Sequence, residues 1–124
     1  MNMKNAFLVS LLAASVGQTA YASINCISKP NQNGGTASVT ISENEEGQPT
    51  VLLFAQGGRA HFMTRQGPFV ATAQHEPDGT FYTFEDYSGQ TGTVAVITSA
   101  IDGKLQTTAS ANFGMWENTT MYCR

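Results

Sequence analysis

The sequence predicts an all-β fold, a small antiparallel meander of about eight strands closed into a barrel, with a two-sheet β-sandwich as the alternative. Turn signals containing Gly or Pro recur along residues 23–124 at roughly 8–14-residue intervals, as expected for short strands in barrels and sandwiches. The segments between them are rich in Val, Ile, Thr, Phe and Tyr, which favour strands. Apolar residues at helical spacing with helix caps are not found in this region.

The first element, residues 1–22, is predicted to be a secretory signal peptide rather than part of the fold. Lys4 precedes an apolar run at 6–16, and Ala20-Tyr21-Ala22 supplies the small residues of a cleavage site. The apolar run is too short to span a bilayer, which takes about 20 residues. Removing 22 of the 124 residues leaves a single β domain, 23–124, of 102 residues.

The turn signals divide this domain into candidate strands. In chain order, the signals are Asn33-Gly34-Gly35, Glu46-Gly47-Gln48-Pro49, Gly57-Gly58, Gly67-Pro68, Pro77-Asp78-Gly79, Ser88-Gly89, Asp102-Gly103 and the region of Gly114. The strand segments lie at about 24–29, 36–43, 50–56, 59–65, 69–76, 80–87, 91–99, 104–112 and 117–123. Alternation is clear at 36–43, where Val39 and Ile41 face one side and Thr40 and Ser42 the other, as in a sheet with one wet face. Asp102-Gly103 is a strong two-residue hairpin signal.

The two cysteines define how the meander is expected to close. Cys26 lies in the first candidate strand and Cys123 in the last. An even pair in an exported chain predicts a disulfide, and a disulfide requires Cα atoms within about 7 Å. Because short connections pair each strand with its sequence neighbour, a bridge between the two ends favours a closed barrel. The predicted localisation is therefore periplasmic or secreted.

Composition and charge exclude several classes of function. The chain has a net charge of −3, which becomes −4 when Lys4 leaves with the signal peptide, and only 12% of its residues are charged. Nucleic-acid binding needs a basic stripe, and docking on anionic lipid needs basic clusters, so neither is expected. After signal removal no further membrane span is predicted. No cofactor and no metal site is predicted, and no residue pattern assigns the chain to a family.

Two groups of residues are candidates for binding. Arg59, His61 and Arg65 share a parity on one predicted strand, which would place them on one face able to meet an acidic partner or an anionic ligand. Aromatic side chains enriched at protein interfaces form the second group, and the candidate exposed aromatics are Tyr82, Tyr87 and Trp116.

Polar clusters at two other turns are interpreted as solvated hairpin tips. One contains His75, Glu76 and Asp78, and the other Glu43, Glu45 and Glu46.

The function expected from these features is binding rather than catalysis. The leading hypothesis is an exported protein-binding or inhibitory module whose partner is an unidentified protein. The alternative is a carrier of a small apolar ligand in the barrel interior. An enzyme built around His61 and His75 is a weaker hypothesis, because no nucleophile motif such as G-x-S-x-G occurs. The protein is therefore not predicted to be an enzyme.

Overall fold

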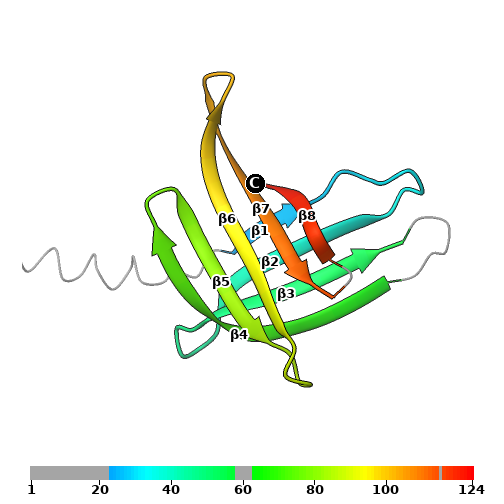
Figure 1. Ribbon diagram of the computed structural model, residues 1–124, viewed down its shortest axis with the longest axis vertical. Coiled ribbons are helices and arrows are strands. Elements are labelled where there is room, and N and C mark those ends of the chain that lie inside the picture. Colours follow the sequence, from blue (N-terminus) through cyan, green and yellow to red (C-terminus); the bar gives the residue numbers. More distant parts are fainter. Residues whose placement is uncertain (1–22, 58–62, 115) are drawn as a thin grey trace, which may run out of the picture.

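Eight antiparallel strands make up the fold. The computed structural model of the chain describes residues 23–57, 63–114 and 116–124 (Figure 1). The strands are β1 (Ile24–Ile27), β2 (Thr36–Glu43), β3 (Pro49–Gln56), β4 (Met63–Glu76), β5 (Gly79–Glu85), β6 (Thr91–Ile101), β7 (Lys104–Phe113) and β8 (Trp116–Cys123). The signal peptide predicted for residues 1–22 lies outside the described residues.

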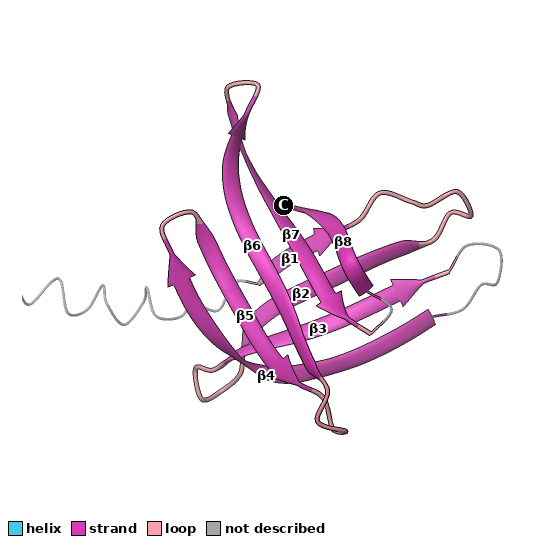
Figure 2. Cartoon of the chain, viewed as in Figure 1, coloured by secondary structure: helices cyan, strands magenta, loops and turns pink. Residues whose placement is uncertain are grey.

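The strands form a closed barrel in sequence order, and β8 returns to pair with β1. Every neighbouring pair is antiparallel, so the chain is a meander, and the described residues form strands and connecting loops without a helix (Figure 2). The predicted all-β barrel is confirmed, and the two-sheet sandwich is not the architecture observed. Closure leaves no sheet edge along the body of the barrel, which removes the free edges that an open meander would present.

The seam between β1 and β8 is the shortest pairing of the barrel. Its register contains Cys26 opposite Cys123 and Ile27 opposite Tyr122, and the Arg124 amide donates a hydrogen bond to the Asn25 carbonyl at 3.1 Å. The predicted disulfide is confirmed: Cys26 and Cys123, 97 positions apart, are bonded across this seam. The bond is consistent with an extracellular or periplasmic protein.

β4 differs from the prediction, because residues 59–65 and 69–76 were expected to be two strands with a turn at Gly67-Pro68. The structure has one long strand that bends there. Val51 pairs with Phe69 and Leu53 with Gln66, so two residues of β4 stand opposite one of β3, which is a β-bulge. Gly67 has φ of +103°, and a Cβ there would lie 2.6 Å from the Val51 carbonyl oxygen. Proline is tolerated at such a bulge because its missing N–H interrupts no ladder bond.

The core consists of inward-facing side chains from all eight strands. Its buried members are Cys26, Val39, Ile41, Val51, Leu53, Phe69, Ala71, Tyr82, Phe84, Val94, Val96, Ala109, Ala111, Phe113 and Met121. They alternate with outward residues along each strand, as the period of two requires. These side chains occupy the middle of the barrel.

Three phenylalanines fill the end of the barrel that carries the β5–β6 turn. Phe69 and Phe84 stack with ring centroids 5.2 Å apart, and Phe113 tilts against Phe84, also at 5.2 Å. Gly92 provides the space for this cluster, because a Cβ at Gly92 would collide with the Phe84 ring and lie 2.7 Å from Phe113 Cδ1. This end is therefore closed by aromatic packing.

Candidate functional site

The opposite end of the barrel contains a pocket, and we call this end the mouth. The β2–β3 turn (residues 44–48) and the β4–β5 turn (residues 77–78) both lie there, together with the start of β1. The pocket has a volume of about 320 Å³ and is lined by Ile24, Ile41, Ser42, Glu43, Gly47, Pro49, Ala73, His75 and Tyr82. This volume is at the lower end of the range of small-molecule sites, roughly 300–1,000 Å³.

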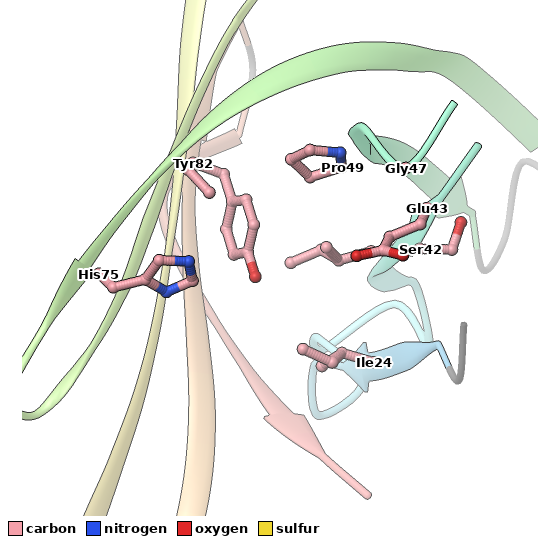
Figure 3. A pocket seen from close by; sticks show the side chains of 9 residues that line it. Ile24, Ser42, Glu43, Gly47, Pro49, His75 and Tyr82 are labelled. Carbon is pink, nitrogen blue, oxygen red and sulfur yellow. The ribbon is translucent and has the colours of Figure 1, made fainter. Parts of the chain in front are cut away.

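The lining of the mouth pocket contains both apolar and polar side chains. Ile24, Ile41 and Ala73 contribute aliphatic surface and pack against the core. The Tyr82 side chain and the His75 ring extend into the pocket from β5 and β4, and Glu43 faces them from β2 (Figure 3). The pocket can therefore hold a molecule with an apolar body and a polar or charged group.

Glu43 and His75 line the pocket because they share parity with core residues. Glu43 follows Val39 and Ile41 on the inward face of β2, and His75 follows Ala71 on the inward face of β4. Both side chains were interpreted from the sequence as parts of solvated hairpin tips. Their parity with the buried residues before them was the sequence signal that could have placed them at the barrel opening.

Hydrogen bonding and electrostatics orient the polar groups of the pocket. The His75 Nδ1 atom and the Thr80 hydroxyl are 3.1 Å apart and share a hydrogen bond, which restrains the imidazole ring. Burial raises the pKa of the Tyr82 hydroxyl above its ordinary value, and the negative charge of Glu43 raises it further. Tyr82 is therefore a neutral hydrogen-bond donor at physiological pH.

Acidic side chains surround the mouth. Five exposed acids lie at the two turns beside the pocket: Glu43, Glu45, Glu46, Glu76 and Asp78. Among the described residues, Lys104 and Arg124 are the basic side chains at this end, and Lys104 lies at the far end of the β6–β7 hairpin. The field at the mouth is negative and favours cations.

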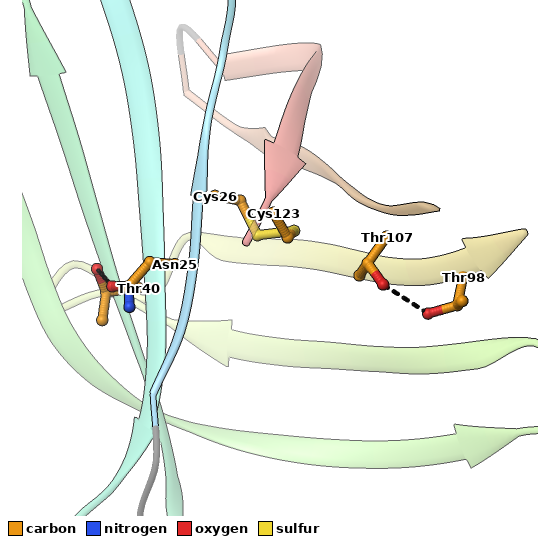
Figure 4. The surroundings of a disulfide bond; sticks show 6 residues. All are labelled: Asn25, Cys26, Thr40, Thr98, Thr107 and Cys123. Carbon is orange, nitrogen blue, oxygen red and sulfur yellow. Dashed lines mark hydrogen bonds between the residues drawn. A yellow bond between two sulfur atoms is a disulfide. The ribbon is translucent and has the colours of Figure 1, made fainter. Parts of the chain in front are cut away.

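The β6–β7 hairpin extends beyond the barrel at the mouth end (Figure 1). The pairing of β6 with β5 ends at Ile97, and the pairing of β7 with β8 ends at Thr108. Residues 99–106, which we call the hairpin tip, pair only with each other in the described sheet. At the base, the hydroxyls of Thr98 and Thr107 are 2.9 Å apart and share a hydrogen bond (Figure 4).

The hairpin tip carries two large exposed apolar side chains, Leu105 at 80% and Ile101 at 46% exposure. Asp102 and Gly103 both have positive φ, 55° and 78°, as a two-residue turn of type I′ requires. The hairpin predicted from Asp-Gly is thus confirmed. Leu105 belongs to the inward parity of β7, but it is exposed because the strand continues past its neighbours.

Of the predicted cationic face, only Arg65 lies within the described residues, so the face stays a prediction. Arg65 is exposed on β4. The β-bulge shifts the alternation of inward and outward side chains along β4. Before the bulge, Gln66 pairs with buried Leu53 and faces inward, so its neighbour Arg65 faces outward. Arg59 and His61 lie outside the described residues.

The candidate exposed aromatics have three different outcomes. Tyr82 was expected to be exposed, and this is wrong: it is 7% exposed, because it shares the inward face of β5 with Phe84. Tyr87 is 91% exposed on the β5–β6 turn, at the end away from Tyr82, and its ring centroid lies 5.5 Å from that of Phe69. The side chain of Trp116 lies outside the described residues.

A metal-binding cluster and a membrane-spanning helix are both absent from the described residues. Within residues 23–57, 63–114 and 116–124, no three His, Cys, Asp or Glu side chains are grouped so that they could hold a metal ion. No helix in those ranges has the length and apolar character needed to cross a membrane. Comparison with protein-family models, curated proteins and solved structures finds no match to this chain.

Proposed function

We propose that the protein is an exported protein-binding module that contacts its partner through the hairpin tip, residues 99–106. The observation that carries the proposal is the projection of this tip beyond the barrel with Leu105 at 80% exposure. When a partner covers a leucine that is so exposed, much of its apolar surface is removed from water. This burial contributes about 25 cal/mol per Å² to the free energy of binding.

The hairpin tip also suits binding because it is ordered before contact. Three residue pairs hold its two strands together, from Ser99 opposite Gln106 to Ile101 opposite Lys104. A preformed element loses less conformational entropy on binding than a flexible loop does. The two strands of the tip have outer edges that pair with no other strand of the described sheet, and such edges can accept an added strand from a partner.

The compartment is part of this proposal. The disulfide between Cys26 and Cys123 supports an oxidising environment, and the apolar run and cleavage residues of 1–22 support export to the periplasm or the exterior. The partner is then a protein of the envelope or of the surroundings, and an inhibitory role would follow if the hairpin tip enters a functional cleft of that partner.

The second candidate function is that of a ligand carrier, restricted to a small ligand at the mouth of the barrel. Core side chains occupy the middle of the barrel, and the Phe69–Phe84–Phe113 cluster fills one end. The mouth pocket has room for a small ligand. A large apolar ligand in the barrel interior is therefore less favoured than a small ligand at the mouth.

Photo-crosslinking in the producing cells tests the hairpin tip. A photoreactive amino acid at position 105 should yield a discrete adduct of higher mass. The matched control is position 70, because Val70 is also apolar and 53% exposed but lies on the barrel wall in β4. No adduct at 105, or equal adducts at both positions, would refute the proposal.

A second substitution tests the same surface. Ala100 pairs with Leu105 across the hairpin and so lies on the same face. Ala100→Asp, combined with the photoreactive residue at 105, should abolish the adduct by placing a charge in the buried contact. Because Ala100 is exposed, the change in unfolding free energy should stay within about 0.5 kcal/mol, so loss of the adduct would not reflect misfolding. Retention of the full adduct in a folded variant would contradict a role for the apolar tip.

A further inference from the structure

We propose that the mouth pocket binds a compact organic cation, with its apolar body against Ile24 and Ile41 and its ammonium group at Glu43. This site is separate from the hairpin tip, and it stands or falls independently of protein binding. The pocket combines an open concave volume, an aliphatic lining and a carboxylate within one described set of residues.

The size of the pocket limits the ligand. A volume of about 320 Å³ can hold a single small ring or a short branched chain, but it is small compared with most drug-sized sites. Ile24, Ile41 and Ala73 supply the apolar contacts. Because the core continues directly below these residues, the ligand cannot penetrate into the barrel and must leave its polar group near the rim.

The carboxylates around the pocket determine the sign of the charge that the polar group of the ligand carries. Glu43 is in the pocket lining, and Glu45, Glu46, Glu76 and Asp78 stand at the surrounding turns. An anionic ligand would be repelled by these carboxylates, whereas a cation would gain a direct partner in Glu43 and a favourable field on approach.

Two further side chains contribute to the recognition of a cation. The Tyr82 hydroxyl and the His75 ring border the same space as Glu43 (Figure 3), and the aromatic face of Tyr82 offers a cation–π surface. The bond between His75 Nδ1 and Thr80 leaves Nε2 available to the ligand. An amine with several N–H donors can therefore be shared among a carboxylate, an imidazole and an aromatic ring.

A titration with phenethylamine tests the site, because this probe joins one apolar ring to one ammonium group. Binding is followed by amide chemical shifts and calorimetry on the purified protein. Saturable shifts should appear at Ile41, Ala73 and Tyr82, and phenethyl alcohol and hydrocinnamate, the neutral and anionic counterparts, should bind more weakly. Equal binding of the alcohol, preference for the carboxylate, or no saturable shift with millimolar amine would overturn the proposal.

A matched pair of variants tests the role assigned to Glu43. Glu43→Gln preserves the shape of the side chain and should weaken phenethylamine binding about fivefold, the value of a partly exposed ion pair. Glu46→Gln removes the same charge from the neighbouring turn, outside the pocket lining, and should change affinity by less than about twofold because exposed charges are screened. If the two substitutions weaken phenethylamine binding equally, the amine responds only to the overall negative charge of the mouth, and the proposed site is refuted.

Discussion

The disulfide should supply a large part of the stability of the barrel. Replacing both cysteines, Cys26→Ala with Cys123→Ala, frees the two ends of a chain whose bonded positions are 97 residues apart. In the chain-entropy model, opening a loop of about 100 residues costs about 4.7 kcal/mol. Total stability of a small domain is about 5–15 kcal/mol, so the variant should be close to marginal.

The structure adds a reason to expect the full effect. The β1–β8 seam contains two residue pairs, so few other interactions hold it closed when the covalent bond is absent. With an unfolding entropy of about 2.1 cal/mol/K per residue, a loss of 4.7 kcal/mol over the 102 residues of the domain lowers the melting temperature by about 20 °C. Amides of the seam, including Arg124, should also exchange with solvent faster.

Chemical denaturation and thermal melting, each with and without reductant, measure this prediction. Reduced wild-type protein keeps the sulfur atoms and so controls for the lost volume of buried Cys26. It should match the double variant, which itself should not respond to reductant. If oxidised wild type and the double variant unfold at the same temperature and denaturant midpoint, the seam does not depend on its covalent bond and the reasoning fails.

Two further predictions concern the two ends of the barrel. Gly92→Ala should destabilise the protein by about 1–3 kcal/mol, because the added methyl group meets the Phe84 and Phe113 rings; a stability gain in urea titration, as alanine gives in an unobstructed strand, would contradict this. At the mouth, burial and Glu43 raise the pKa of Tyr82, so the folded state resists ionisation that the unfolded chain allows. Stability should therefore fall as pH rises above the ordinary phenol value of about 10, and Tyr82→Phe should remove part of that fall. Identical pH profiles of the two proteins between about pH 8 and 11 would show that Tyr82 ionises as freely in the barrel as in the unfolded chain.

Local patterns predicted the barrel well where each strand ended at a conventional turn. Asp102-Gly103 indicated its hairpin, because both residues tolerate the left-handed backbone that the turn requires. Gly67-Pro68 carried the same kind of local signal but forms a bulge. The difference arises from the partner strand, since the pairing of β4 continues past these residues along β3.

The candidate site was harder to predict than the fold. Tyr82 was predicted to be exposed, although it is buried on the inward face of β5. Alternation in a single strand shows that two faces differ, but it does not show which aromatic residue of a pair such as Phe81 and Tyr82 faces the core. Packing against β4 and β6 decides that choice.

By itself, the sequence determined the strand-rich class, most turns and the pairing of its only two cysteines, because these depend on residue chemistry at neighbouring positions or on simple counting. The tertiary structure decided where Glu43, His75 and Tyr82 meet, since they come from three strands that surround one end of the barrel. It also decided that residues 99–106 project, because β6 and β7, with 11 and 10 residues, run past the 7-residue β5 and the 8-residue β8. Whether a side chain is covered or exposed depends on neighbours that only closure of the barrel brings beside it.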